Sequence, residues 1–134
     1  MQTLPTTEIK LFEFLREKIP DLKLSEFKYS KFDCYSEKHN LDIELKCRRT
    51  HYDDLLIEKK KYDALIKRSK HFNTTPYYIN STPEGIWAFD LSKFNPKWEE
   101  RRMPRTTDFS NNNKINKEVG YLNINEGKKI DLNS

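Results

Sequence analysis

The sequence lacks several features that mark common classes of protein. Its 134 residues contain no run of about 18 apolar residues, which excludes a membrane-spanning helix. Two cysteines, Cys34 and Cys47, are too few for a disulfide scaffold or for a zinc site built from cysteines. Three glycines leave no glycine-rich phosphate loop, which excludes a nucleotide-hydrolysing motor. No basic segment followed by an apolar stretch opens the chain, so we expect no secretory signal and an intracellular, reduced protein.

What the chain does contain is charge and aromatic side chains. Charged residues make up 34%, aromatic residues 13% and hydrophobic residues 35%, enough for one modest core. The formal net charge is +4, but residues 46–70 alone hold nine lysines and arginines against four acidic residues, a local charge of +5. Such a concentration of positive charge suggests a polyanionic partner, and the alternative is a solvated helix face.

Two segments have the apolar spacing of amphipathic helices. The first spans residues 6–19, between a threonine at position 6 or 7 that can cap it and Pro20, which ends it. The second spans residues 52–70, with two aspartates in its first turn. The apolar stripes consist of Ile9, Phe12, Leu15 and Ile19 in the first helix and of Leu55, Tyr62, Leu65 and Ile66 in the second.

Four segments have strand character. Residues 31–36 and 41–47 alternate apolar and polar side chains, and the short polar linker between them predicts an antiparallel hairpin. Phe27 and Tyr29 are candidates for an earlier start of the first of these strands. The segments PYYINS (76–81) and IWAFDL (86–91) predict two more strands, joined by a turn.

The C-terminal third has a weaker pattern. Two prolines and three consecutive asparagines predict a long loop over residues 92–113, and residues 114–125 predict one last strand. We expect the polar segment 126–134 to be a frayed tail. The chain therefore predicts one domain over residues 1–125 of the α/β (α+β) class, in which a small mixed β-sheet is flanked by helices.

The predicted hairpin places chemistry on one face. If Tyr35 pairs with Asp42, then Asp33 faces Glu44, and Lys46 lies two residues along the same face. Facing carboxylates repel one another, and a divalent cation would compensate them. With a backbone carbonyl, they form a hard oxygen site that suits Mg²⁺ or Mn²⁺. The alternative is that Lys46 merely bridges the two acids on an exposed strand.

This arrangement resembles the PD-(D/E)XK nuclease superfamily, and in particular small phage and archaeal nucleases of the Holliday-junction-resolvase type. The resemblance covers residues 6–90. It rests on the order of a helix that contains acids, FDCY (32–35), DIELKCR (42–48), a basic helix and PYYI (76–79). It implies a restriction-endonuclease-like core, Asp33, Glu44 and the Leu45 carbonyl as metal ligands, and Lys46 as a catalytic residue. Residue 32 is Phe where the family name has Pro.

The resemblance also implies an acid on the first helix that acts as a metal ligand and catalytic residue. Aligned by its apolar stripe, Glu8 is the best match and Glu13 the alternative, and either could instead be an exposed helix carboxylate. In this superfamily the second helix often sends a lysine to the site. Drawn as a helix over residues 52–70, the segment places Lys61 between Ile57 and Leu65, on the inward side.

Other charged residues are weaker candidates. Lys59 and Glu58 are alternatives to Lys61, and a snorkelling lysine is the alternative to a catalytic one. Arg48 and Arg49, just past the motif, could bind phosphates together with Lys59 and Lys61, or could simply favour solubility. The histidines lack metal-ligand spacing, so we expect surface or capping roles, with a phosphate contact as an alternative for His51.

These residues predict a metal-dependent endonuclease that acts on DNA, in which water activated by Mg²⁺ and Lys46 hydrolyses the phosphodiester bond. The second hypothesis is a nucleic-acid-binding protein that has the nuclease-like fold without catalysis. A third is cleavage of RNA, because nothing in the sequence separates RNA from DNA. A homodimer is expected by analogy alone, since cutting both strands needs two sites.

Overall fold

The computed structural model describes residues 3–25, 33–104 and 114–132. Two α-helices and nine strands lie in these ranges, together with two short 3-10 helices, η1 (Leu91–Lys93) and η2 (Ile124–Glu126). In chain order, the main elements are α1 (Glu8–Lys18), β1 (Lys23–Leu24), β2 (Asp33–Ser36), β3 (Leu41–Cys47), β4 (Asp54–Glu58), α2 (Lys59–Phe72), β5 (Thr75–Thr82), β6 (Gly85–Asp90), β7 (Glu99–Pro104), β8 (Lys114–Asn123) and β9 (Lys128–Ile130).

The strands form two sheets. The larger is a six-stranded mixed sheet in the order β1-β2-β3-β5-β6-β9, in which β3 and β5 are parallel and every other neighbouring pair is antiparallel. The smaller is an antiparallel sheet in the order β4-β8-β7. The connection from β3 to β5 passes through β4 and α2, as a parallel pair requires. The predicted class, a mixed sheet flanked by helices, is confirmed.

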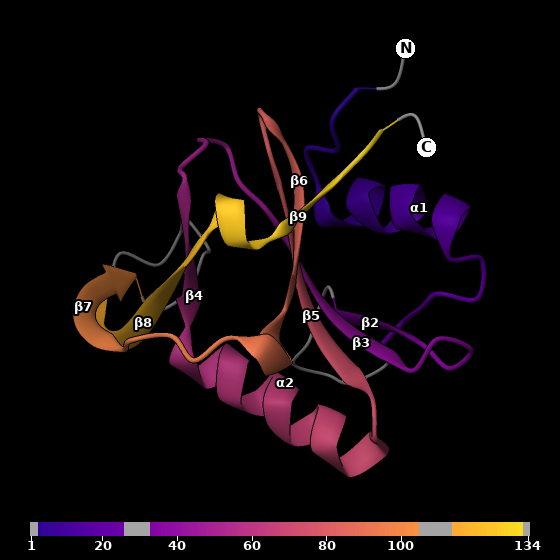
Figure 1. The fold of residues 1–134 in the computed structure, drawn as a ribbon. Coiled ribbons are helices and arrows are strands. Elements are labelled where there is room, and N and C mark those ends of the chain that lie inside the picture. Colours follow the sequence, from indigo (N-terminus) through magenta and orange to yellow (C-terminus); the bar gives the residue numbers. More distant parts are fainter. Residues whose placement is uncertain (1–2, 26–32, 105–113, 133–134) are drawn as a thin grey trace.

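The two helices lie on opposite sides of the larger sheet (Figure 1). Leu11 and Leu15 of α1 pack against Cys34, Ile43 and Leu45 in one hydrophobic cluster. A second cluster, on the other side, joins α2 to the smaller sheet through Leu55, Ile57, Leu65, Tyr78, Trp87, Phe89, Leu91 and Leu122. Because β3 and β5 contribute alternate residues to the two sides, each is covered on both faces.

Helix α1 forms as predicted. Thr7 has an extended backbone and its Oγ1 accepts a hydrogen bond from the amide of Lys10, 3.2 Å away, which caps the helix. Leu11, Phe12 and Leu15 are its buried residues. The spacing of these three side chains directs one stripe of the helix into the core and leaves its charged residues outside.

The second predicted helix is wrong in its first part. Residues 54–58 are not helical but form strand β4, and α2 begins only at Lys59. The side chains of Leu55 and Ile57 both point into the core, and the two residues pair with Leu122 and Gly120 of β8. The two apolar side chains, two residues apart, fit one face of a strand, whereas our helical pattern took Leu55 as the start of its stripe.

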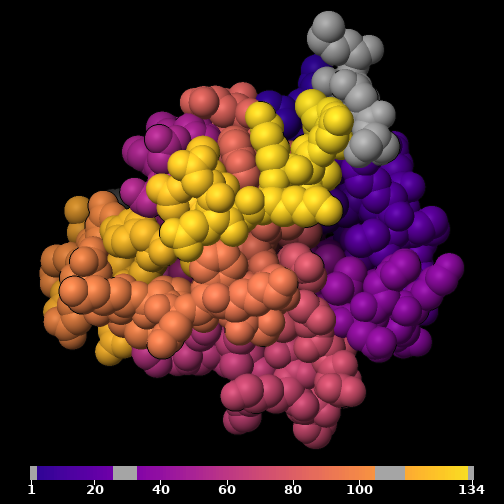
Figure 2. All heavy atoms as spheres, viewed as in Figure 1, coloured from indigo at the N-terminus to yellow at the C-terminus, as the bar shows by residue number. Residues whose placement is uncertain are grey.

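The C-terminal predictions hold only in part. The strand expected within residues 114–125 is present as β8, but residues 99–104, predicted to be loop, form β7 and pair with it. Residues 128–130 are not frayed, because β9 pairs with β6 and places Ile130 opposite Ile86. Figure 2 shows the C-terminal segment (yellow) lying against the body of the molecule. The predictions for Phe27, Tyr29 and residues 105–113 lie outside the described residues.

No helix in the described part of the chain is long and apolar enough to cross a membrane.

Candidate functional site

The β2–β3 hairpin has the predicted register. Asp33 pairs with Glu44 and Tyr35 with Asp42, so the two carboxylates face one another across adjacent strands. Lys46, two residues after Glu44 on β3, lies on the same face. Cys34, Ile43 and Leu45 point to the opposite face, into the cluster beneath α1. The three residues of the predicted motif are therefore gathered on the side that α2 covers.

Helix α2 brings two cations to these carboxylates. Nζ of Lys61 lies 3.4 Å from Oε1 of Glu44, and Nη1 of Arg68 lies 3.2 Å from Oδ2 of Asp33. The Lys61 side chain is 48% exposed, whereas that of Arg68 is only 20% exposed. Seven residues separate them, which is two helical turns, so both project from the same face of α2. The predicted inward direction of Lys61 agrees with its contact to Glu44, although the predicted helix wrongly included Ile57.

Arg68 was not among the residues that the sequence singled out. Its guanidinium also reaches Asp42, with Nε 3.1 Å from Oδ1, and Oδ2 of Asp42 accepts a hydrogen bond from the hydroxyl of Thr74 at 2.6 Å. Asp42 is buried, although an acid seldom is unless it has partners. A polar residue at every second position of β3 was the one signal that could have pointed to Asp42. No pattern in the sequence indicates Arg68, because its role depends on the contact between α2 and the sheet.

Lys46 lies in surroundings that disfavour its charge. Burial lowers the pKa of its amine, and the positive charges of Lys61 and Arg48 lower it further, while Glu8 and Glu58 act in the opposite direction. Glu8 also acts on the thiol of Cys47, whose pKa burial raises to about 12. The N-terminal end of α1 therefore brings Glu8 into electrostatic range of the end of β3.

The Arg48 side chain turns into the protein. Nε donates a 2.7 Å hydrogen bond to Oδ1 of Asn80, and Nη2 donates to the carbonyl of Leu56 and to the hydroxyl of Tyr78. These contacts join β3, β4 and β5, so the guanidinium is already used by the fold and is poorly placed for the phosphate that we assigned to it. Arg49, the next residue, is exposed. The amide nitrogen of the fully buried Asn80 has no hydrogen-bond partner among the described residues.

The two remaining candidates, Lys59 at the start of α2 and Glu58 at the end of β4, face other groups. Nζ of Lys59 lies 2.6 Å from Oδ2 of Asp63, one turn along the helix, and 5.9 Å from the centre of the Trp98 ring. Glu58 is held by Lys117 of β8, with Oε1 2.9 Å from Nζ, and both side chains are largely buried. Glu58 nevertheless acts on the charge of Lys46, so the Glu58–Lys117 pair borders the site.

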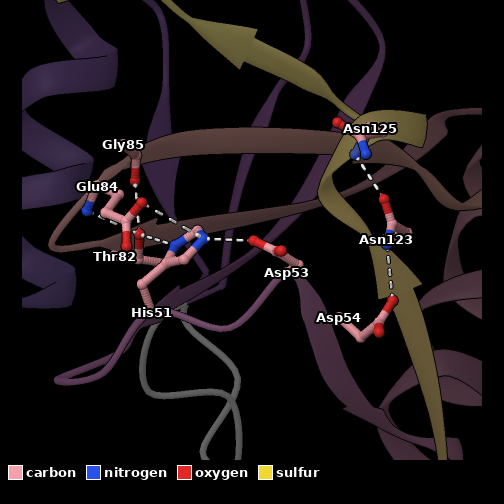
Figure 3. Close-up of polar contacts among 8 residues, drawn as sticks. All are labelled: His51, Asp53, Asp54, Thr82, Glu84, Gly85, Asn123 and Asn125. Atoms are coloured by element: carbon pink, nitrogen blue, oxygen red, sulfur yellow. Dashed lines mark hydrogen bonds and ion pairs between the residues drawn. The ribbon is translucent and has the colours of Figure 1, made fainter.

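His51, for which we expect a surface or capping role or a phosphate contact, packs against neighbouring residues of the fold. Its Nδ1 lies 2.9 Å from Oγ1 of Thr82 and its Nε2 lies 3.0 Å from Oδ1 of Asp53, while its ring lies 5.2 Å from that of Trp87. Figure 3 shows the imidazole between the end of β5 and the residues that lead into β4. The side chain is 10% exposed, so the histidine fastens the β3–β4 connection to the larger sheet.

The donor set fits a hard divalent cation. Asp33 and Glu44 lie opposite one another on β2 and β3, and together with the backbone carbonyl of Leu45 they would offer such a cation oxygen donors. The described residues contain no group of three or more His, Cys, Asp or Glu side chains that could hold a metal ion by themselves. Two carboxylates are nevertheless the usual complement for Mg²⁺, which keeps several of its water molecules.

Comparison with known proteins bears on the fold. No family model matches the sequence, and no curated protein sequence matches it. The fold is similar to the structure of Hjc from Archaeoglobus fulgidus, a Holliday junction resolvase from an archaeal hyperthermophile, with a TM-score of 0.55 over 92% of this chain and 93% of that one. The two sequences are 15% identical, so the likeness concerns the fold alone. The chain therefore shares the overall fold of that structure, in agreement with the fold class that the resemblance implied.

Proposed function

We propose that the protein is a metal-dependent endonuclease that hydrolyses phosphodiester bonds in DNA. The observation that carries the proposal is the pairing of Asp33 with Glu44, with Lys46 on the same face, within a nuclease-like fold. Two facing acids destabilise a hairpin unless a cation compensates them. Lys61 and Arg68 provide part of this compensation. Neither ion pair requires the partly buried Lys46 on the same face, and it is this third group that points to chemistry.

In this proposal each residue has a separate task. Asp33, Glu44 and the carbonyl of Leu45 would hold Mg²⁺ or Mn²⁺, with Glu8 near enough to contribute charge from α1. The metal would acidify a bound water and stabilise charge on the phosphate. Lys46 would take the proton of the attacking water, a role for which its position on the same face as Glu44 and the lowering of its pKa by burial are both favourable. Lys61 would orient Glu44 and, being half exposed, could also meet the phosphate.

DNA is proposed as the substrate on two grounds. The basic segment 46–70 includes Lys61 and Arg49, whose exposed side chains can contact a phosphate backbone. The similar fold is that of a protein named as a Holliday junction resolvase. A branched DNA is therefore the first substrate to test, and a homodimer follows as a further proposal, because resolving a junction requires two cuts.

A second candidate is a nucleic-acid-binding protein without catalysis. The observation in its favour is that Lys61 and Arg68 already neutralise Glu44 and Asp33. A protein that only binds nucleic acid has no need of the partly buried Lys46, however, and two carboxylates weaken its hold on a phosphate backbone.

Cleavage assays separate the two candidates. Wild type and Lys46→Ala are incubated with branched, duplex and single-stranded DNA and with RNA, each with Mg²⁺ or with EDTA. We expect the wild type to cut branched DNA in Mg²⁺, and both EDTA and the substitution to stop cleavage. Cleavage that survives either change would contradict the mechanism. Binding without cleavage on every substrate would favour the second candidate, and cleavage confined to RNA would correct the substrate.

A further inference from the structure

One side chain of α2 links the two acids of the hairpin that lie furthest from solvent. Arg68 contacts Oδ2 of Asp33 through Nη1 at 3.2 Å and Oδ1 of Asp42 through Nε at 3.1 Å. The side chains of Asp33 and Asp42 are 10% and 9% exposed. A lysine could not bridge them in the same way, because the guanidinium presents several donors in a fixed plane whereas an ammonium is a point charge.

Arg68 is itself supported from behind. The hydroxyl of Thr74 donates to Oδ2 of Asp42 at 2.6 Å, which leaves Oδ1 of Asp42 for Nε of Arg68. The contacts therefore run in one line from Thr74 through Asp42 and Arg68 to Asp33. Each member restricts the next, since a charged group with a fixed partner has fewer orientations available.

The end of this line is a proposed metal ligand. Arg68 engages Oδ2 of Asp33, so the carboxylate can keep this contact and still offer Oδ1 to a cation. Nη2 of Arg68 is buried and without a hydrogen-bond partner among the described residues, and Nε, although close to Asp42, has no aligned acceptor there. The contact of Arg68 with Asp42 is therefore an ion pair alone, whereas its contact with Asp33 is also a hydrogen bond.

We propose that Arg68 is a positioning residue that holds the carboxylate of Asp33 in the orientation needed to bind the divalent metal. This inference rests on the proposed function. A residue that contacts a metal-binding side chain without contacting the metal fixes the orientation of that side chain. Its loss typically lowers metal affinity by about 10–100-fold. The opposite possibility is simple competition, in which the positive charge of Arg68 repels the metal and its removal tightens binding.

Titration calorimetry with Mn²⁺ on the full chain distinguishes these possibilities. Arg68→Lys keeps the charge and loses the bridge, so we expect Mn²⁺ to bind at least about tenfold more weakly. Thr74→Val, which removes the donor to Asp42 and leaves Arg68 in place, should lower the affinity in the same direction by a smaller factor. Thr74→Val also keeps the test available if Arg68→Lys does not fold.

Ser69→Ala is the matched control. Ser69 is a buried neighbour on α2 whose hydroxyl donates to the carbonyl of Ile66, and in the described part of the chain it forms no hydrogen bond with Asp33. Its substitution should leave Mn²⁺ affinity unchanged, even where it lowers thermal stability. Unchanged or tighter Mn²⁺ binding in Arg68→Lys, while the wild type binds Mn²⁺ and cleaves DNA, would overturn the role of Arg68 alone. A wild type that binds no Mn²⁺ would overturn the proposed function together with it.

Discussion

Replacing Lys46 by methionine is expected to stabilise the fold at neutral pH and to abolish hydrolysis. The lysine is largely removed from water and lies near the positive charges of Lys61 and Arg48, so its ammonium is disfavoured in the folded protein. Methionine has a similar length and no charge, and it fills irregular space well. The substitution therefore removes an unfavourable charge while it leaves the packing nearly intact.

The expected gain is modest. Glu8 and Glu58 offset part of the unfavourable surroundings, and Lys46 keeps some exposure, so we expect the free energy of unfolding to rise by about 1 kcal/mol at pH 7. The gain should depend on pH. The pKa of Lys46 is lower in the folded protein than in the unfolded chain. The free energy of unfolding of the wild type therefore rises as the pH increases from that lowered pKa to 10.5. The advantage of the variant should therefore shrink as pH approaches 10.5.

Urea denaturation followed by circular dichroism, from pH 7 to pH 10, measures this difference. Lys60→Met is the control, since Lys60 is an exposed lysine on α2, and its effect should stay within about 0.5 kcal/mol at every pH. A Lys46→Met protein that is less stable than the wild type at pH 7, or whose advantage does not change with pH, would refute the reasoning. Cleavage by Lys46→Met at the wild-type rate would contradict a catalytic role for Lys46.

Three further predictions concern the surroundings of the site. Arg48→Ala should lower the free energy of unfolding by about 2–4 kcal/mol in urea denaturation, because the side-chain oxygen of the buried Asn80 loses the hydrogen bond that Arg48 donates. Weaker DNA binding at unchanged stability would instead support a phosphate contact of Arg48. Lys61→Gln should change stability by less than about 1 kcal/mol and slow cleavage about tenfold, since its pair with Glu44 is half exposed; an unchanged rate would remove it from the site. The thiol of Cys34, whose pKa burial raises to about 12, should stay unmodified by a thiol reagent at pH 8 until urea unfolds the chain; rapid reaction of the native protein would contradict its burial.

The sequence was most informative about the β2–β3 hairpin. Alternation with a period of two fixes which side chains share a face, and a short linker leaves few registers, so the pairing of Asp33 with Glu44 could be predicted from the residues alone. The position of Lys46 follows from the same period. The helix α1 was equally accessible, because a capping threonine and a clear apolar stripe agree with one another.

The parts that sequence reasoning missed depend on distant contacts. Residues 54–58 read equally well as the start of a helix, and only pairing with β8 makes them a strand. Strand β7 is mostly exposed and charged, so it has no hydrophobic pattern to reveal it. Arg68 looked like one of several basic residues near the end of α2. Its contacts with Asp33 and Asp42 depend on how the helix crosses the sheet, which no local pattern encodes.

If the facing carboxylates of Asp33 and Glu44 bind a metal that drives hydrolysis, Glu44→Gln should slow the cleavage of DNA. The substitution keeps the size of the side chain and removes the charge that a metal needs. With branched DNA and Mg²⁺, we expect a single-turnover rate at least about a hundredfold below that of the wild type, while the exposed α1 control Glu17→Gln cleaves normally. A Glu44→Gln protein that cleaves at the wild-type rate would contradict the account.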